Sequence, residues 1–201
     1  MQNQKMIKVD NYKNPIILCF LLIAVFILFL FIYTTEAKST KSVEDKTDYK
    51  ELIQKYFPGY VLMDIEELDP YAKDRFRSYH PDLNPSLVCG DFDGNGFLDY
   101  AFLLRNSKDK KGTTIFTIFM QSKHSQFKLE FCLNMGFYRN DVIIQRIEAG
   151  KILSQTKSID EPKEDVKLKN AAVELAYFEK SSVVYYWDDR TKKFQSIWTS
   201  D

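Results

Sequence analysis

The feature that most constrains the fold is a series of short apolar segments between residues 86 and 199. They are rich in β-branched and aromatic residues, and polar turns separate them, as is typical of β-strands. We expect strands near 86–90, 97–104, 113–121, 126–134, 141–148, 171–178, 182–187 and 194–199. Most connections between them are too short for crossover helices, so the sheet should be mainly antiparallel.

The distribution of apolar residues indicates which faces of three predicted strands are buried. Segments 97–104 and 113–121 have apolar side chains at both alternating sets of positions, which predicts central strands covered on both faces. In segment 126–134 the apolar residues alternate with polar ones, which predicts one solvated face. The alternating apolar residues are Phe127, Leu129, Phe131 and Leu133.

Two helices are expected before the first strand. Apolar residues recur at helical spacing from Tyr49 to Phe57, and the pair Pro58-Gly59 ends the pattern. A second helix is predicted to begin at Asp69, with Pro70 at its first position, and to end at His80. The expected fold class is α+β: two short helices packed on a mainly antiparallel sheet of about seven or eight strands, preceded by an N-terminal transmembrane helix.

The transmembrane expectation comes from residues 16–32, which are apolar without interruption. The segment is longer than the apolar core of most signal peptides, and with Tyr33 it is at the short end of the range that spans a bilayer. Lysines precede it, which places that end in the cytoplasm. We therefore expect a cytoplasmic tail 1–15, a signal anchor 16–33, a flexible tether 34–47 and an extracytoplasmic domain 48–201. The alternative is a signal peptide cleaved after Ala37, which would yield a secreted protein.

The charges exclude one class of partner, and the cysteines raise the question of a disulfide. Residues 34–201 hold 25 basic and 27 acidic residues, with no basic stripe, so we exclude nucleic acid as a partner. Cys89 and Cys132 are the two cysteines outside the apolar segment. In an oxidising compartment they could form a disulfide, and two free thiols are the alternative.

The stretch CGDFDGNGFLDY, residues 89–100, combines carboxylates and an amide at alternate positions with glycines. A backbone that wraps around an ion points every second group inward, and glycines permit the tight turns this needs. All the candidate donors are hard oxygens, which favours calcium (Ca2+) over zinc or copper. The predicted ligands are Asp91, Asp93, Asn95, Asp99 and the carbonyl of Phe97.

The loop is not an EF-hand, because Phe102 stands where that motif needs a bidentate glutamate and the flanks are strand-like. Residues 87–104 instead resemble the calcium loop of FG-GAP or VCBS-type repeats, found in integrin-alpha-like proteins, whose pattern is GDFDGDGxxDLAV. The resemblance implies calcium at the five positions given above. This chain has a single copy, so the propeller of multi-copy members is not expected. The alternative is a turn rich in Asp, Asn and Gly for conformational reasons alone.

Other candidates carry weaker signals. Glu66, Glu67 and Asp69 could be paired carboxylates for glycoside chemistry, but an acidic face leading into a helix cap is the simpler interpretation. The two histidines, His80 and His124, have no nucleophile nearby in the sequence. An aromatic group could form a platform for sugar or peptide, although cross-strand packing explains it more simply. It comprises Tyr177, Tyr185, Tyr186, Trp187 and Trp198.

Together these features predict a membrane-anchored extracytoplasmic domain that binds calcium and serves interaction with a protein partner in the cell envelope. The motif supplies no nucleophile or base, so a non-enzymatic role with structural calcium is favoured. The alternatives are an extracytoplasmic hydrolase that uses carboxylates, with calcium as an organiser, and a purely structural accessory subunit.

Overall fold

A computed structural model describes residues 49–80, 83–109, 112–123, 126–155, 165–178 and 180–199 of the chain. The expected tail 1–15, anchor 16–33 and tether 34–47 lie outside these ranges. Within them, no helix is both long enough and apolar enough to cross a membrane.

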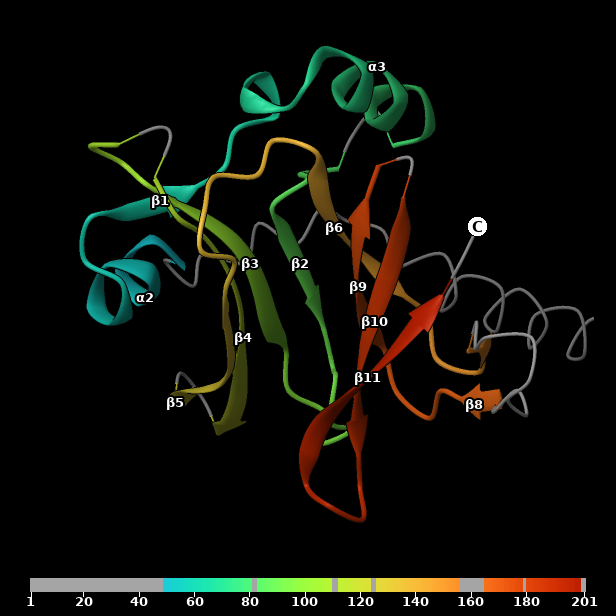
Figure 1. The fold of residues 1–201 in the computed structure, drawn as a ribbon. Coiled ribbons are helices and arrows are strands. Elements are labelled where there is room, and N and C mark those ends of the chain that lie inside the picture. Colours follow the sequence, from blue (N-terminus) through green and yellow to red (C-terminus); the bar gives the residue numbers. More distant parts are fainter. Residues whose placement is uncertain are drawn as a thin grey trace, which may run out of the picture. The chain divides into compact units, whose positions relative to one another are not determined.

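In the described part of the chain, eleven strands form three sheets, and every strand pair is antiparallel (Figure 1). In the first sheet β3 pairs with β4 and β4 with β5, while β1 and β2 both pair with β3. Its strands are β1 (Tyr60–Leu62), β2 (Leu87–Gly90), β3 (Asp99–Asn106), β4 (Thr114–Lys123) and β5 (Gln126–Asn134). The second sheet has the order β11-β10-β9-β6. Its strands are β6 (Val142–Ile147), β9 (Ala172–Tyr177), β10 (Ser181–Asp188) and β11 (Lys193–Thr199). The third sheet is the pair β7 (Ile152–Ser154) and β8 (Asp165–Lys167).

The main hydrophobic core lies between the first two sheets. Ala101, Leu103 and Phe116 of the first sheet pack in one cluster with Val173 and Leu175 of the second. Phe116 has its ring centroid 5.0 Å from that of Tyr185 on β10, so aromatic contacts bridge the two sheets. The layers are thus sheet on sheet, with the inward residues of both sheets sharing one core.

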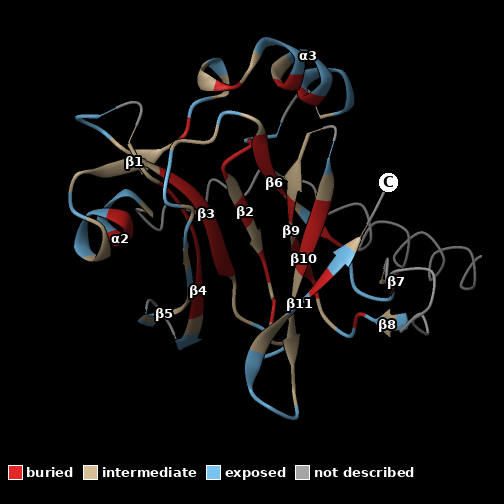
Figure 2. Ribbon diagram, in the orientation of Figure 1, coloured by how far each residue is buried: buried red, intermediate tan, exposed pale blue. Residues whose placement is uncertain are grey.

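The opposite face of each sheet is also covered. The helix α2 (Tyr49–Tyr56) buries Leu52 and Ile53 against Phe102 and Phe119 of the first sheet. On the second sheet, Leu153 of β7 packs against Ala172, among others. Because β3 and β4 are covered on both faces, most of their residues are buried, which confirms the prediction of central strands (Figure 2).

The segment before β2 contains the short 3-10 helix η1 (Ile65–Glu67) and the helix α3 (Pro70–Tyr79). Asp69 is the N-cap of α3 and accepts a hydrogen bond from Tyr71 N at 3.0 Å, while His80 is the C-cap. Proline at the first position fits because its missing N–H has no partner inside a helix. The predicted boundaries of this helix are confirmed.

A β-bulge changes the face that β5 presents. Ile118 lies opposite Phe131 and Phe119 lies opposite Leu129, so Glu130 is an extra residue on β5. Leu129 consequently packs on the α2 side of the sheet, whereas Phe131 packs in the core between the sheets. The prediction that the apolar residues of 126–134 share one face is therefore wrong, because an inserted residue inverts the alternation beyond it.

The expected α+β fold class is also wrong, since the described chain is mostly β-sheet with two short helices. All eight predicted strands are present, but a second sheet covers the first where helices were expected to do so. Sequence missed β1, β7 and β8, which have three residues each and are too short to show an alternating pattern. The expected N-terminal transmembrane helix falls at 16–33, outside the described residues.

Both described cysteines are free thiols. Cys89 is on β2 and Cys132 on β5, and β3 and β4 lie between these strands. Three steps of about 4.8 Å between neighbouring strands put their Cα atoms roughly 14 Å apart, twice the limit of about 7 Å for a disulfide. The sheet order therefore favours the free-thiol alternative.

Candidate metal centre

The acidic turn joins β2 to β3, which pair through Gly90 and Asp99. Gly94 and Gly96 have φ of +75° and +86°, the left-handed conformation that favours glycine. Phe92 is completely buried in the core between the sheets, so the turn is attached to the fold through this side chain. The strand-turn-strand context expected from the sequence is present.

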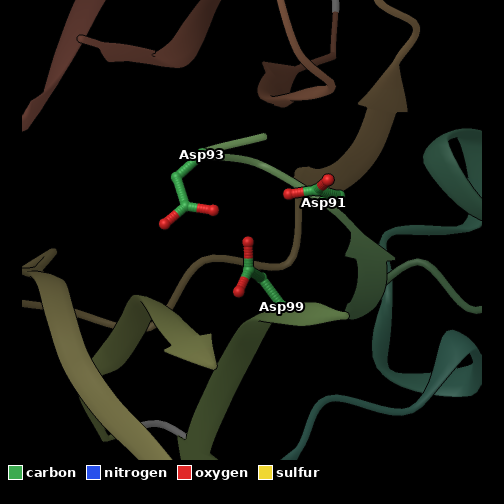
Figure 3. Close-up of side chains that lie close together, drawn as sticks. All are labelled: Asp91, Asp93 and Asp99. Atoms are coloured by element: carbon green, nitrogen blue, oxygen red, sulfur yellow. The ribbon is translucent and has the colours of Figure 1, made fainter. Parts of the chain in front are cut away.

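The turn brings three of the predicted ligands together. Asp91, Asp93 and Asp99 each offer a carboxylate oxygen, and these oxygens lie within 4.8 Å of one another (Figure 3). The carboxylates point toward a common space in the close-up, two from the turn and one from the first residue of β3. Within the described part of the chain, no lysine or arginine forms an ion pair with any of them.

Backbone N–H groups hold Asp91 in place. Its Oδ1 accepts from Gly94 N at 2.8 Å and from Asn95 N at 3.0 Å, and its Oδ2 accepts from Gly96 N at 2.9 Å. The turn therefore folds around this first carboxylate, as aspartate-initiated turns do. Such bonds fix the carboxylate before any ion is present.

Asp99 is the most constrained of the three carboxylates. It is fully buried, and its two oxygens accept from Phe92 N at 2.8 Å and from Gln121 N at 2.7 Å. Burial raises the pKa of Asp99 to about 7; the two hydrogen bonds oppose this rise, and the nearby negative charges of Asp93 and Asp91 add to it. The pKa of Asp93 is also raised, first by burial and then, in part, by Asp91. A cation here would relieve the repulsion among the carboxylates, which is the smaller cause of these two pKa shifts after burial.

The other two predicted ligands contribute differently. Asn95 uses its amide oxygen to accept from Phe97 N at 2.7 Å, and its Nδ2 donates to Asp93 Oδ2 at 3.0 Å. Asn95 thus presents an N–H, and not its oxygen, to the carboxylate group. Phe97 lies two residues before Asp99 in the same turn, and the ligand role of its carbonyl stays a prediction.

Two residues that sequence reasoning missed support the turn. Gln121 of β4 donates its N–H to Asp99 and accepts at its carbonyl from Asn95 Nδ2 at 2.8 Å. Asn170, just before β9, approaches the turn so closely that a Cβ on Gly94 would lie 2.7 Å from Asn170 Oδ1. The Gln121 contacts use backbone atoms that any residue could supply, and Asn170 is distant in sequence, so no local signal marks either one.

The other candidate carboxylates have structural roles. Glu67 completes a capping box with Asp64 and forms an ion pair with Arg105, and Glu66 forms ion pairs with Lys73 and Arg77. These roles, with Asp69 as the N-cap of α3, account for the acidic face as helix capping and ion pairing.

His80 and three residues of the aromatic group have structural roles. His80 caps α3, with its ring 5.5 Å from that of Phe76, and His124 lies outside the described residues. Tyr185 and Trp187 pack in the core between the sheets, while Tyr186 packs on the opposite face of β10. The five aromatic residues therefore do not form one platform, and packing explains these three.

Comparison with protein-family models, with curated proteins and with solved structures found no significant match to this chain.

Proposed function

We propose that this chain is a calcium-binding domain of the interaction type, in which calcium stabilises the fold and takes no part in catalysis. The observation that carries the proposal is the convergence of Asp91, Asp93 and Asp99 within 4.8 Å. Asp91 and Asp99 are further held by backbone N–H groups from the turn and from β4.

The donor set suits calcium. Calcium takes six to eight oxygen ligands in flexible geometry, and three carboxylates with the Phe97 carbonyl supply hard oxygens from one turn. Rotation of the Asn95 amide would exchange its N–H for its oxygen and add the fifth donor that the resemblance to FG-GAP or VCBS-type loops implies. Bound calcium would supply positive charge among carboxylates that otherwise repel one another.

Calcium at this place would stabilise the fold by connecting strand ends. Asp91 follows β2, Asp99 begins β3, and Gln121 of β4 bonds to Asp99, so one ion would connect the ends of three strands. We place the domain outside the cytoplasm, where millimolar calcium suits weak sites. The apolar segment 16–33 would deliver it across the membrane, and residues 34–47 would serve as the tether between membrane and domain. The domain would then interact with a protein partner in the cell envelope.

The experiment is thermal unfolding of the full-length protein in phosphatidylcholine nanodiscs, with calcium or with a chelator. Calcium at ten times its dissociation constant should add about 1.4 kcal/mol to the free energy of unfolding, which raises Tm by roughly 3–6 °C. Asp91→Ala should abolish this rise. Asp74→Ala, which removes an exposed carboxylate on α3, should retain it. Equal Tm values for the wild-type protein in calcium and in chelator would refute the proposal.

A further inference from the structure

A cavity of 200 Å³ lies between α3 and the face of the second sheet that β7 partly covers. It is separate from the acidic turn, since none of its lining residues belongs to that turn. Residues of β6, β9 and β10 line its sheet side, and Ile143, Ala176 and Ser182 follow one another across these strands. In Figure 1, α3 lies beyond one end of β6 and β9.

The α3 wall of the cavity is a cationic group set between two aromatic rings. Tyr71, Arg75 and Tyr79 are four residues apart and so share one face of the helix. Arg75 Nη1 donates to the Tyr71 hydroxyl at 2.9 Å, and the guanidinium carbon lies 5.8 Å from the centroid of the Tyr79 ring. Tyr71 and Tyr79 are nevertheless 47% and 68% exposed, which leaves aromatic surface open to a ligand.

The sheet side of the cavity carries planar polar groups. Gln145 and Glu174 face each other across β6 and β9, and Gln145 Nε2 donates to Glu174 Oε2 at 2.5 Å. Both residues line the cavity and are half-buried. The Gln145 bond fixes the Glu174 carboxylate, which can still accept hydrogen bonds from a ligand because each carboxylate oxygen has two acceptor positions.

Charge in the cavity excludes simple ions as the preferred ligand. Among the described residues that line the cavity, Arg75 contributes a guanidinium and Glu174 a carboxylate, so an anion meets Glu174 and a cation meets Arg75. A neutral ligand rich in hydroxyl groups has no such conflict. Its hydroxyls can donate to Glu174 and accept from Arg75 and Gln145, while its C–H groups pack on tyrosine rings.

From this combination we infer that the cavity between α3 and the second sheet is a saccharide-binding site that holds one sugar ring. The volume supports a ring-sized ligand, because pockets for larger drug-sized molecules measure about 300–1,000 Å³. Tyr71 and Tyr79 line the cavity and keep exposed ring surface, on which the rest of a glycan chain would pack.

The test is saturation-transfer NMR on the full-length protein in phosphatidylcholine nanodiscs, which contain no sugar. The probes are glucose, galactose, mannose and N-acetylglucosamine, with glycine and acetate as charged competitors. At least one sugar should receive saturation, and neither competitor should displace it. Failure of all four sugars to bind, or displacement by glycine, would overturn the inference, the latter in favour of a zwitterionic ligand.

Variants then locate the binding. Tyr79→Ala removes an exposed ring and should lower the affinity for the sugar about fivefold to tenfold. Glu174→Gln removes the charged acceptor and should lower the affinity by a similar factor. Phe137→Ala, which also removes an exposed ring but outside the cavity, should leave affinity unchanged. Equal losses for Tyr79→Ala and Phe137→Ala would overturn the assignment to this cavity. Chelation of calcium should leave sugar binding in place, so this inference and the calcium proposal can fail separately.

Discussion

At the scale of single residues, Gly94 and Gly96 have the same backbone requirement but different surroundings. Both have positive φ, so any substitution introduces strain. A Cβ on Gly94 would also lie 2.7 Å from Asn170 Oδ1, whereas a Cβ on Gly96 would meet nothing within 4 Å. The two glycines therefore separate backbone strain from a steric contact between the turn and the segment before β9.

We predict that Gly94→Ala lowers the free energy of unfolding by more than Gly96→Ala does. Strain alone costs about 1–2 kcal/mol at each position, and the contact with Asn170 adds to the loss at Gly94. Asn170→Ala in the Gly94→Ala background should recover part of that loss, whereas it should not help Gly96→Ala. Urea unfolding of the single and double variants measures the coupling. Equal losses at both glycines with no recovery would contradict the prediction.

The carboxylate of Asp141 makes the free energy of unfolding depend on pH. Burial acts to raise its pKa, but hydrogen bonds and charge from Lys180 and Arg139 outweigh burial and lower it. Arg139 donates to both carboxylate oxygens at 2.7 Å, and Lys180 Nζ lies 2.9 Å away. A carboxyl whose folded pKa is lowered stabilises the protein above its unfolded pKa, and this contribution disappears as pH falls through the folded pKa.

Asp141→Asn should therefore lower the free energy of unfolding by about 1–2 kcal/mol at pH 7. The difference from the wild-type protein should shrink as pH falls below about 4, where the unfolded chain takes up the proton. Urea unfolding between pH 2.5 and pH 7 measures this, with Asp74→Asn as an exposed control. A difference that stays constant over this range would show that the Asp141 charge does not supply the stability.

At the scale of elements, local patterns predict strands and helix caps well but do not detect an inserted residue. The helix α3 begins after Asp69 as the Asp-Pro pair predicts, because both cap residues lie next to the helix they define. The bulge at Glu130 has no comparable signal. The alternation of 126–134 is unbroken in sequence, and only pairing with β4 shows that Phe131 and Leu129 belong to different faces.

Deletion of Glu130 should destabilise the protein strongly. Without the extra residue, Phe127 and Leu129 would turn away from the α2 side of the sheet, or the strand would lose its register with β4. Exposing these two side chains costs about 3 kcal/mol or more. Glu130→Ala keeps the residue count and removes only an ion pair with Lys128, so it should cost less than about 1 kcal/mol. Chemical unfolding of both variants compares them, and similar stabilities would contradict a role for the bulge in register.

At the scale of the whole molecule, the arrangement of sheets depends on pairings that no local pattern encodes. β1 pairs with β3, and in this pairing Tyr60 lies opposite Asn106, which is far away in sequence. The local sequence around either residue does not indicate its partner. The same reasoning explains the site: Asp91, Asp93 and Asp99 lie in one turn and were predicted, whereas Gln121 and Asn170 reach the turn through tertiary structure. Sequence therefore predicts the longer strands and the acidic turn, whereas the three-residue strands and the stacking of one sheet on another depend on tertiary structure.

The sheet order makes a last prediction about the two described cysteines. Because β3 and β4 separate Cys89 from Cys132, no disulfide can join them in the folded chain. Cys89 is half-buried whereas Cys132 is exposed, and desolvation raises the pKa of both thiols, so alkylation of the folded protein near neutral pH should be slower at Cys89 than at Cys132. Alkylation in denaturant without reductant, followed by peptide mapping, should find both cysteines modified, and a reductant should leave Tm unchanged. A linked Cys89–Cys132 peptide would require β2 and β5 to be neighbours and would contradict the order of the first sheet.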